Sequence, residues 1–237
     1  MDYWEGSVRM ITPEQAARLI DISAVRTANT LSDIREIVQY AQKYRFINVH
    51  ALPCWVSLLS GMLTDVPDVY VGAPVGFPSG GHRTEIKLEE AKLLLSDGVQ
   101  EMDIVMNVGR FRNKEYDYVL GELSQIIGIT PENVLTKVII EINTLSDSEV
   151  EKACELVIES GADYVKTGSG WISGNANIAR IQKIKQICGS RIKVKAAGGI
   201  RTPREFLELY NMGVERMGIN TKSALEIVEH FGVKRVT

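Results

Sequence analysis

The architecture of the protein follows from two stretches of sequence, Ala162-Asp-Tyr-Val-Lys-Thr-Gly-Ser-Gly170 and Ile192-Lys-Val-Lys-Ala-Ala-Gly-Gly-Ile-Arg-Thr-Pro203. Each is a short apolar run that carries a lysine near its end and continues directly into glycines. One such lysine is commonly a residue whose ammonium reaches the rim of a sheet. Two of them, in consecutive runs, predict two amines that face one cavity. Their mutual repulsion would leave one amine neutral near pH 7, and a neutral amine can form an imine with a carbonyl.

Apolar runs of similar length recur along the chain and alternate with helical patterns. We expect strands at 19–23, 46–50, 68–72, 99–107, 136–142 and 215–219, in addition to the sixth and seventh strands in the two quoted stretches. We expect helices at 12–19, from 32 onward, and at 53–63, 84–96, 114–127, 147–160, 177–188, 202–210 and 223–231. Eight strand–helix units predict an α/β protein of the (β/α)8 TIM-barrel class, with one domain over residues 1–237 and a short extra N-terminal helix. No GxGxxG follows the first strand, which disfavours an open dinucleotide-binding sheet.

The barrel prediction determines where each lysine points. Side chains alternate along a strand, so Lys166 and Lys195 face the barrel interior when Val165 and Val194 pack under the helices. Both lysines then lie at the C-terminal ends of their strands, where barrels carry their catalytic groups. Lys193 shares the face of Lys195 and is expected at the opposite rim of the barrel.

A carboxylate in the fourth strand completes the predicted catalytic set. Asp103 shares one face of that strand with Glu101 and Val105. An inward Asp103 could pair with a lysine structurally, hold a lysine protonated, or transfer protons through a water molecule. The sequence leaves these three roles open.

The loops after the last three strands predict a phosphate site. A glycine turn that leads into a helix offers backbone N–H groups to an anion, and barrels often bind phosphate after strands seven and eight. The same residue types also serve as ordinary turn and cap residues. The candidates are Thr167, Gly168 and Gly170 after the sixth strand, Gly198, Gly199 and Arg201 after the seventh, and Asn220 and Thr221 after the eighth.

Composition and charge narrow the class of protein. A net charge of −3 favours neither a nucleic-acid nor a membrane partner. The three cysteines form no CxxC motif, which is typical of reduced thiols in a cytoplasmic protein. The three histidines form no HxH or HExxH motif, and no metal or other cofactor is expected. The first residues lack the basic and apolar segments of a signal peptide.

Three motifs together resemble the signature strands of the deoxyribose-phosphate aldolase family of class I aldolases. They are Asp163-Tyr-Val-Lys-Thr-Gly-Ser-Gly170, Val194-Lys-Ala-Ala-Gly-Gly-Ile-Arg-Thr202 and Glu101-Met-Asp103. The resemblance runs from about Asp21 to the last helix and includes Val75-Gly-Phe-Pro78, Thr84-Glu-Ile-Lys87 and Glu90-Ala-Lys92. It implies that Lys166 forms a Schiff base, that Lys195 lowers the pKa of that amine, and that Asp103 acts in proton transfer.

The resemblance implies a carbon–carbon lyase that reversibly cleaves 2-deoxy-D-ribose 5-phosphate to D-glyceraldehyde 3-phosphate and acetaldehyde. The chain departs from the family pattern at His50, where many relatives have cysteine, and at Trp171, where some have lysine. It also carries Asn220-Thr221 where paired serines are expected. Two alternatives therefore stay open: a Schiff-base aldolase for another small phosphorylated sugar, and a non-catalytic barrel that binds a phosphorylated ligand. The expected partner is a small phosphorylated sugar or aldehyde, and a homo-oligomer is left open.

Overall fold

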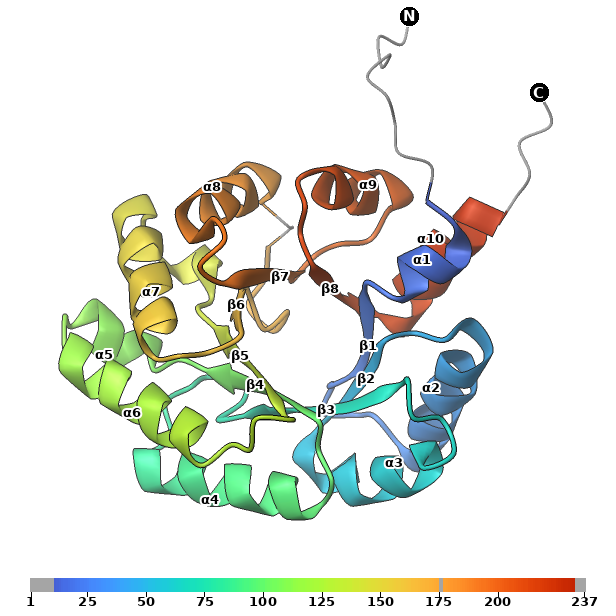
Figure 1. Cartoon of the computed structure of the whole chain (residues 1–237), viewed down its shortest axis with the longest axis horizontal. Helices are drawn as coiled ribbons and strands as arrows, with labels where there is room; N and C mark the ends of the chain where they lie inside the picture. The colour runs from blue at the N-terminus through green and yellow to red at the C-terminus, as the bar shows by residue number, and fades with distance from the viewer. Residues whose placement is uncertain (1–10, 175–176, 233–237) are drawn as a thin grey trace, which may run out of the picture.

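Eight parallel strands close into a barrel in the order β1 to β8, and a ring of helices surrounds it (Figure 1). The structure is a computed structural model that describes residues 11–174 and 177–232. The predicted (β/α)8 TIM barrel is confirmed. The expectation of one domain over 1–237, and that of no signal peptide, involve residues 1–10, 175–176 and 233–237, which lie outside the described residues.

The elements follow one another as regular strand–helix units. The strands are β1 (Ile20–Ala24), β2 (Asn48–Ala51), β3 (Tyr70–Val75), β4 (Glu101–Val105), β5 (Leu135–Ile139), β6 (Tyr164–Lys166), β7 (Lys193–Ala197) and β8 (Arg216–Asn220). The α-helices are α1 (Pro13–Ala17), α2 (Leu31–Tyr44), α3 (Val56–Leu63), α4 (Thr84–Ser96), α5 (Val108–Arg112), α6 (Tyr116–Gly128), α7 (Asp147–Glu159), α8 (Ile178–Cys188), α9 (Pro203–Asn211) and α10 (Thr221–Gly232). Two 3₁₀ turns, η1 (Pro53–Trp55) and η2 (Ile142–Thr144), precede α3 and α7.

Two predicted strands are longer than the strands of the structure. The prediction of 99–107 runs past the end of β4, because the side chain of Asn107 accepts the Arg110 amide and begins α5, a helix that the sequence patterns did not indicate. The prediction of 136–142 runs past the end of β5, because Glu141 adopts a left-handed backbone conformation with φ of 54°. Both turns redirect the chain toward the helical layer.

The short helix before the first strand is also confirmed. The side chain of Thr12 accepts the amide of Gln15, the side chain of Gln15 accepts the amide of Thr12, and Pro13 occupies the first helical position. The helix α1 packs beside α10, so the two ends of the described chain lie together (Figure 1). No helix within 11–174 and 177–232 is both long and apolar enough to cross a membrane. The cysteines are free, with Cys54 exposed and the other two buried.

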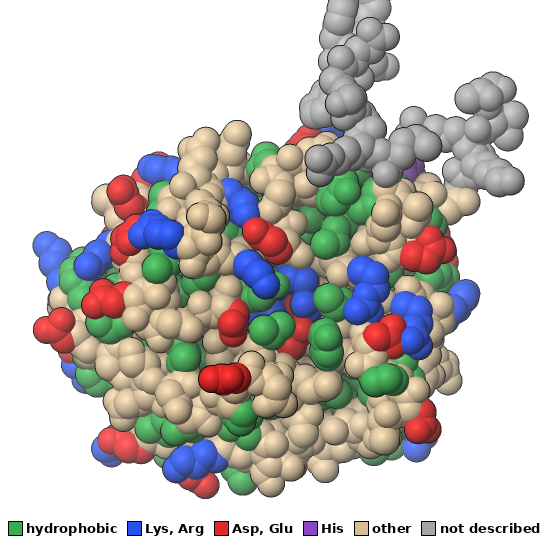
Figure 2. Space-filling model, viewed as in Figure 1, with side chains coloured by type: hydrophobic (Ala, Val, Ile, Leu, Met, Phe, Trp, Pro, Cys, Tyr) green, Lys and Arg blue, Asp and Glu red, His purple; other side chains and the backbone are tan. Residues whose placement is uncertain are grey.

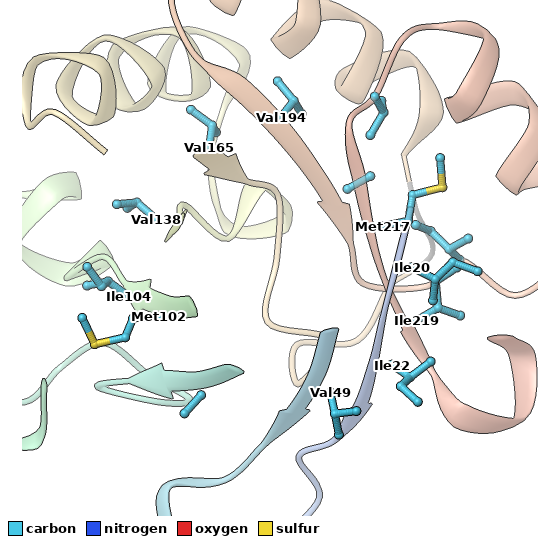
Figure 3. Close-up of a cluster of buried hydrophobic side chains, with 14 of the residues drawn as sticks. Ile20, Ile22, Val49, Met102, Ile104, Val138, Val165, Val194, Met217 and Ile219 are labelled. Carbon is cyan, nitrogen blue, oxygen red and sulfur yellow. The ribbon is translucent and has the colours of Figure 1, made fainter. Parts of the chain in front are cut away.

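The apolar core lies between the barrel and its helices. Figure 3 shows Val138, Val165 and Val194 directed away from the barrel axis, and all three are fully buried. The prediction that Val165 and Val194 pack under the helices is therefore confirmed. Because side chains alternate, the neighbouring residues of the same strands project into the barrel, and these residues are charged.

Two of the family-like motifs build a buried support under the loop after β3. The ammonium of Lys87, in α4, donates to the carbonyl of Val105 at 2.9 Å and to Glu122 of α6 at 2.5 Å. A Cβ on Gly76 would lie 2.6 Å from Lys87 Cε, so only glycine lets the loop pass over this side chain. The Glu90 carboxylate accepts the Gly76 amide at 2.6 Å. These residues fix the loop that forms one wall of the central cavity.

We predict that Lys87→Met destabilises the protein by about 3–5 kcal/mol, because Glu122 would remain buried without its partner cation. The free energy of unfolding, measured by urea denaturation, checks this. The double variant Lys87→Met/Glu122→Leu is the control, and it should be more stable than the single variant because no buried charge is left unpaired. An unchanged urea midpoint for Lys87→Met would contradict the structural role of the pair.

Candidate active site

The three predicted catalytic side chains meet inside the barrel. Lys166 and Lys195 lie directly beside each other in the register of β6 and β7. Their ammonium nitrogens each lie 2.7 Å from the same atom, Oδ2 of Asp103. Asp103 is fully buried, while Lys166 retains 7% of its exposure and Lys195 retains 1%. The two amines are thus bound to one carboxylate oxygen at the edge of a cavity.

Four further charged residues, which sequence reasoning did not place in the site, extend this arrangement. Lys137 of β5 contacts Asp103 Oδ1 at 3.2 Å and Glu101 at 2.5 Å. Asp21 of β1 accepts Lys195 at 2.5 Å, and Arg216 of β8 bridges Asp21 and Glu101. Together with the three predicted side chains they form a charge cluster of seven. Its members are Asp21, Glu101, Asp103, Lys137, Lys166, Lys195 and Arg216.

The charge cluster contains three carboxylates and four cations, so one neutral amine balances it. Lys137 lies within 4.0 Å of three carboxylates and Lys195 within 4.0 Å of two. Within the described residues, Lys166 contacts Asp103 alone. An arginine stays protonated in proteins, which excludes Arg216 as the neutral member. Lys166 is therefore the cation with the least compensation, and it is the one that can lose its proton.

The pKa of Lys166 agrees with this weak compensation. The pKa of Lys166 is lowered from 10.5 to about 8; burial is the largest cause, the positive charges of Lys195 and Lys137 act in the same direction, and Asp103 opposes them. The predicted repulsion between the two lysines thus contributes, but burial is the larger cause. Burial also opposes ionisation of Asp103, yet Lys137, Lys166 and Lys195 outweigh it and hold the pKa of that carboxyl well below its usual range.

His50, one of the departures from the family pattern, lies against the charge cluster. Its Nε2 is 3.5 Å from Asp103 Oδ2, and burial holds the pKa of the imidazole well below 6.5. Neither ring nitrogen has a hydrogen-bond partner among the described residues. Gly72 leaves the space that the ring fills, because a Cβ there would collide with His50 Nδ1. His50 is consequently a neutral side chain and does not alter the charge balance.

A cavity of about 570 Å³ opens above the two lysines at the C-terminal ends of the strands. In the space-filling view, cationic and anionic side chains lie together over the middle of the barrel (Figure 2). Five of the eight predicted phosphate-site residues line the cavity, and three do not. The lining residues are Gly170, Gly198, Gly199, Arg201 and Asn220, and the others are Thr167, Gly168 and Thr221.

The three residues outside the cavity lining have local contacts. The hydroxyl of Thr167 joins β6 to β7, because it donates to the carbonyl of Ala197 and accepts the amide of the same residue. Gly168 lies against Glu141, whose carboxylate also accepts the Ser169 amide at 3.1 Å. Thr221 is the first residue of α10. These contacts shape the loops that line the cavity.

Lys193 lies apart from the charge cluster, and the described residues include no grouped metal ligands. Lys193 is exposed at the start of β7, and its ammonium lies 5.5 Å from the ring centre of Tyr164. It therefore sits at the opposite rim of the barrel, as predicted. Within the described ranges, no group of three or more His, Cys, Asp or Glu side chains is arranged to hold a metal ion.

Comparisons with known proteins agree with this geometry. No protein-family model matches the chain. The chain is 42% identical over 219 residues to the deoxyribose-phosphate aldolase of Sinorhizobium medicae, a match that covers 92% of this chain and 88% of that one. The chain belongs to the deoxyribose-phosphate aldolase family. Relatives from Klebsiella pneumoniae and Thermococcus kodakarensis carry the same name, at 37% and 38% identity.

Solved structures of aldolases share the barrel. QR15, described as an aldolase, has a TM-score of 0.85 at 34% identity, and the match covers 91% of this chain and 95% of that one. The deoxyribose-phosphate aldolase of Aeropyrum pernix, described as a unique tetramer, has a TM-score of 0.85 at 27% identity, with 93% and 92% covered. The resemblance predicted from the lysine and aspartate motifs is therefore confirmed at the level of the family.

We predict that Lys195→Met raises the pKa of Lys166 above about 8, because a cation beside it is removed and its carboxylate partner is freed. Reductive methylation of Lys166 with formaldehyde and cyanoborohydride, followed over pH by peptide mass spectrometry, measures the midpoint. Lys193→Met is the matched control, since it removes the same charge from the same strand at the other rim. A midpoint that stays in place or falls in Lys195→Met would contradict the electrostatic account.

Proposed function

We propose that the protein is a class I aldolase that reversibly cleaves 2-deoxy-D-ribose 5-phosphate to D-glyceraldehyde 3-phosphate and acetaldehyde through a Schiff base on Lys166. The observation that carries the proposal is the Lys166 amine, which faces the cavity with a pKa lowered to about 8. A small but useful fraction of this amine is then neutral at pH 7. The other amines of the charge cluster have more carboxylate partners and serve to tune it.

The first half of the reaction forms the covalent bond. The neutral Nζ of Lys166 attacks the C1 aldehyde of the open-chain sugar and gives a carbinolamine. The nitrogen loses a proton, the carbinolamine hydroxyl gains one and leaves as water, and a protonated imine remains. Asp103 is ionised and hydrogen-bonded to both lysines, so it can accept the proton that the nitrogen releases.

The second half breaks a carbon–carbon bond. Because the products contain two and three carbons, the bond that breaks is C2–C3. The C3 hydroxyl gives up its proton, the C2–C3 electron pair moves into the imine, and glyceraldehyde 3-phosphate leaves an enamine on Lys166. Asp103 does not line the cavity, so we assign proton transfer to a water molecule held by the Asp103–Lys195 pair. The same relay returns a proton to C2, and hydrolysis then releases acetaldehyde.

The phosphate of the substrate is assigned to the turn between β7 and α9. The amides just before α9 are already used, because Arg201 N and Thr202 N both donate to the Glu205 carboxylate at 2.9 Å. In the part of the chain that the structure describes, the amides of residues 198–200 donate to no protein acceptor. The proposed anion site is therefore the Gly198-Gly199 turn, with Arg201 beside it, and not the helix N-terminus itself.

The position of Trp171 leaves one alternative substrate class open, namely another small phosphorylated sugar. Its ring forms part of the cavity wall at a position where some relatives carry lysine, so another small phosphorylated sugar could fit the site. Comparing kcat/KM for cleavage of several phosphorylated sugars, with 2-deoxyribose 5-phosphate among them, decides between the two substrates. A preference for a different sugar would keep the imine chemistry and replace the substrate.

We predict that acetaldehyde and borohydride leave one reduced adduct, on the peptide that carries Lys166. Lys166→Ala should lose the adduct and should slow cleavage on the order of 10³–10⁶-fold, because the covalent route is removed. Peptide mass spectrometry and a coupled assay for glyceraldehyde 3-phosphate give the two readouts. Binding of a phosphorylated sugar without any adduct would favour the non-catalytic barrel, and near-normal turnover of Lys166→Ala would refute the assigned nucleophile.

A further inference from the structure

Two guanidinium groups line the cavity near the proposed phosphate turn. Arg26 follows β1, and Arg201 stands between β7 and α9. In the closed barrel only β8 separates β7 from β1, so both loops border the same sector of the cavity. Gly170, from the loop after β6, lines it as well.

Neither guanidinium forms an ion pair with a carboxylate among the described residues. Within residues 11–174 and 177–232, no carboxylate lies within 4.0 Å of the guanidinium nitrogens of Arg26 or Arg201. Arg180 and Arg216, by contrast, each contact an aspartate at 2.8 Å or less. Two arginines at one cavity that form no ion pair within the described ranges can bind an anion with several acceptor oxygens.

Contacts with the loop after β6 orient Arg26. Its Nη2 donates to the carbonyl of Gly170 at 2.9 Å, and its guanidinium carbon lies 5.9 Å from the ring centre of Trp171. The indole is fixed in turn, because its Nε1 donates to the carbonyl of Val25 at 3.0 Å and its ring meets Phe77 edge-on at 5.6 Å. A guanidinium has five N–H donors, so the bond to Gly170 leaves others for a ligand.

The bond to Gly170 places Arg26 next to the proposed phosphate turn. A Cβ built on Gly170 would lie 4.0 Å from the Cα of Gly198, so the two glycine loops nearly touch. Gly198 and Gly199 have φ of 93° and 99°, in the region that favours glycine. Through Gly170, the guanidinium of Arg26 thus lies beside the Gly198-Gly199 turn, whose amides donate to no acceptor among the residues that the structure describes.

We propose that Arg26, oriented by Trp171, is a second cation for the phosphate group of the substrate, an inference that rests on the proposed function. A phosphate monoester carries roughly −1.5 to −2 charges at pH 7, so Arg201 alone would leave part of that charge without compensation. Arg26 supplies the remaining positive charge from the loop after β1, on the other side of this part of the cavity.

The test compares a phosphorylated and an unphosphorylated substrate in matched variants. Arg26→Met should lower kcat/KM for 2-deoxyribose 5-phosphate roughly 10- to 100-fold, mainly through KM, because a charge-assisted hydrogen bond is lost. It should change kcat/KM for 2-deoxyribose by less than about threefold, and Arg26→Lys should recover part of the loss. Arg35→Met, which removes the same charge from the exposed face of α2, is the control and should leave both substrates unaffected.

Equal losses on both sugars in Arg26→Met would mean that Arg26 only fastens two loops, and no loss on either would mean that it contacts nothing; both overturn the inference. If the unaltered protein cleaves neither sugar, the proposed function fails, and calorimetry with inorganic phosphate still tests Arg26. Weaker phosphate binding in Arg26→Met than in Arg35→Met supports the inference. Equal phosphate binding in the two variants overturns it.

Discussion

The balance of charge inside this barrel depends on one atom, Oδ2 of Asp103, which accepts hydrogen bonds from Lys166 and Lys195 at 2.7 Å each. A single oxygen holds the two ammonium groups close together in a nearly dry interior, where charges interact more strongly than in water. Two cations on one oxygen are undercompensated, and the surrounding network decides which of them yields its proton. Lys195 has Asp21 as a second partner, whereas Lys166 has no further carboxylate among the described residues.

The closed barrel offsets the free-energy cost of burying such a network of charges. The outward faces of the strands bury valine, isoleucine and methionine under the helices, and this apolar layer supplies the stability (Figure 3). The inward faces can then carry a costly set of buried charges, provided that each has a partner. Ring closure between β8 and β1 brings Arg216 against Asp21, so the network extends from β8 to β1.

The sequence was sufficient to predict the fold and the inward placement of both lysines and Asp103, because strand alternation and the glycines after each lysine restrict where these side chains point. It was insufficient for Asp21, Lys137 and Arg216. Each is a lone charge in an apolar run, and its partner is chosen by the register between strands and by closure of the barrel. The residues of the glycine loops were ambiguous for another reason: a threonine such as Thr167 can bind a ligand or, as its contacts with Ala197 show, join two strands.

The central claim is that Asp103 restrains deprotonation of Lys166 while burial and the neighbouring lysines promote it. Asp103→Asn tests this most directly, with the pH midpoint of Lys166 methylation by formaldehyde and cyanoborohydride as the readout. The account predicts that the midpoint falls below the pKa of about 8, even though turnover declines, because the opposing charge of Asp103 is gone. A midpoint that rises or does not move would show that the carboxylate is not what balances the two amines.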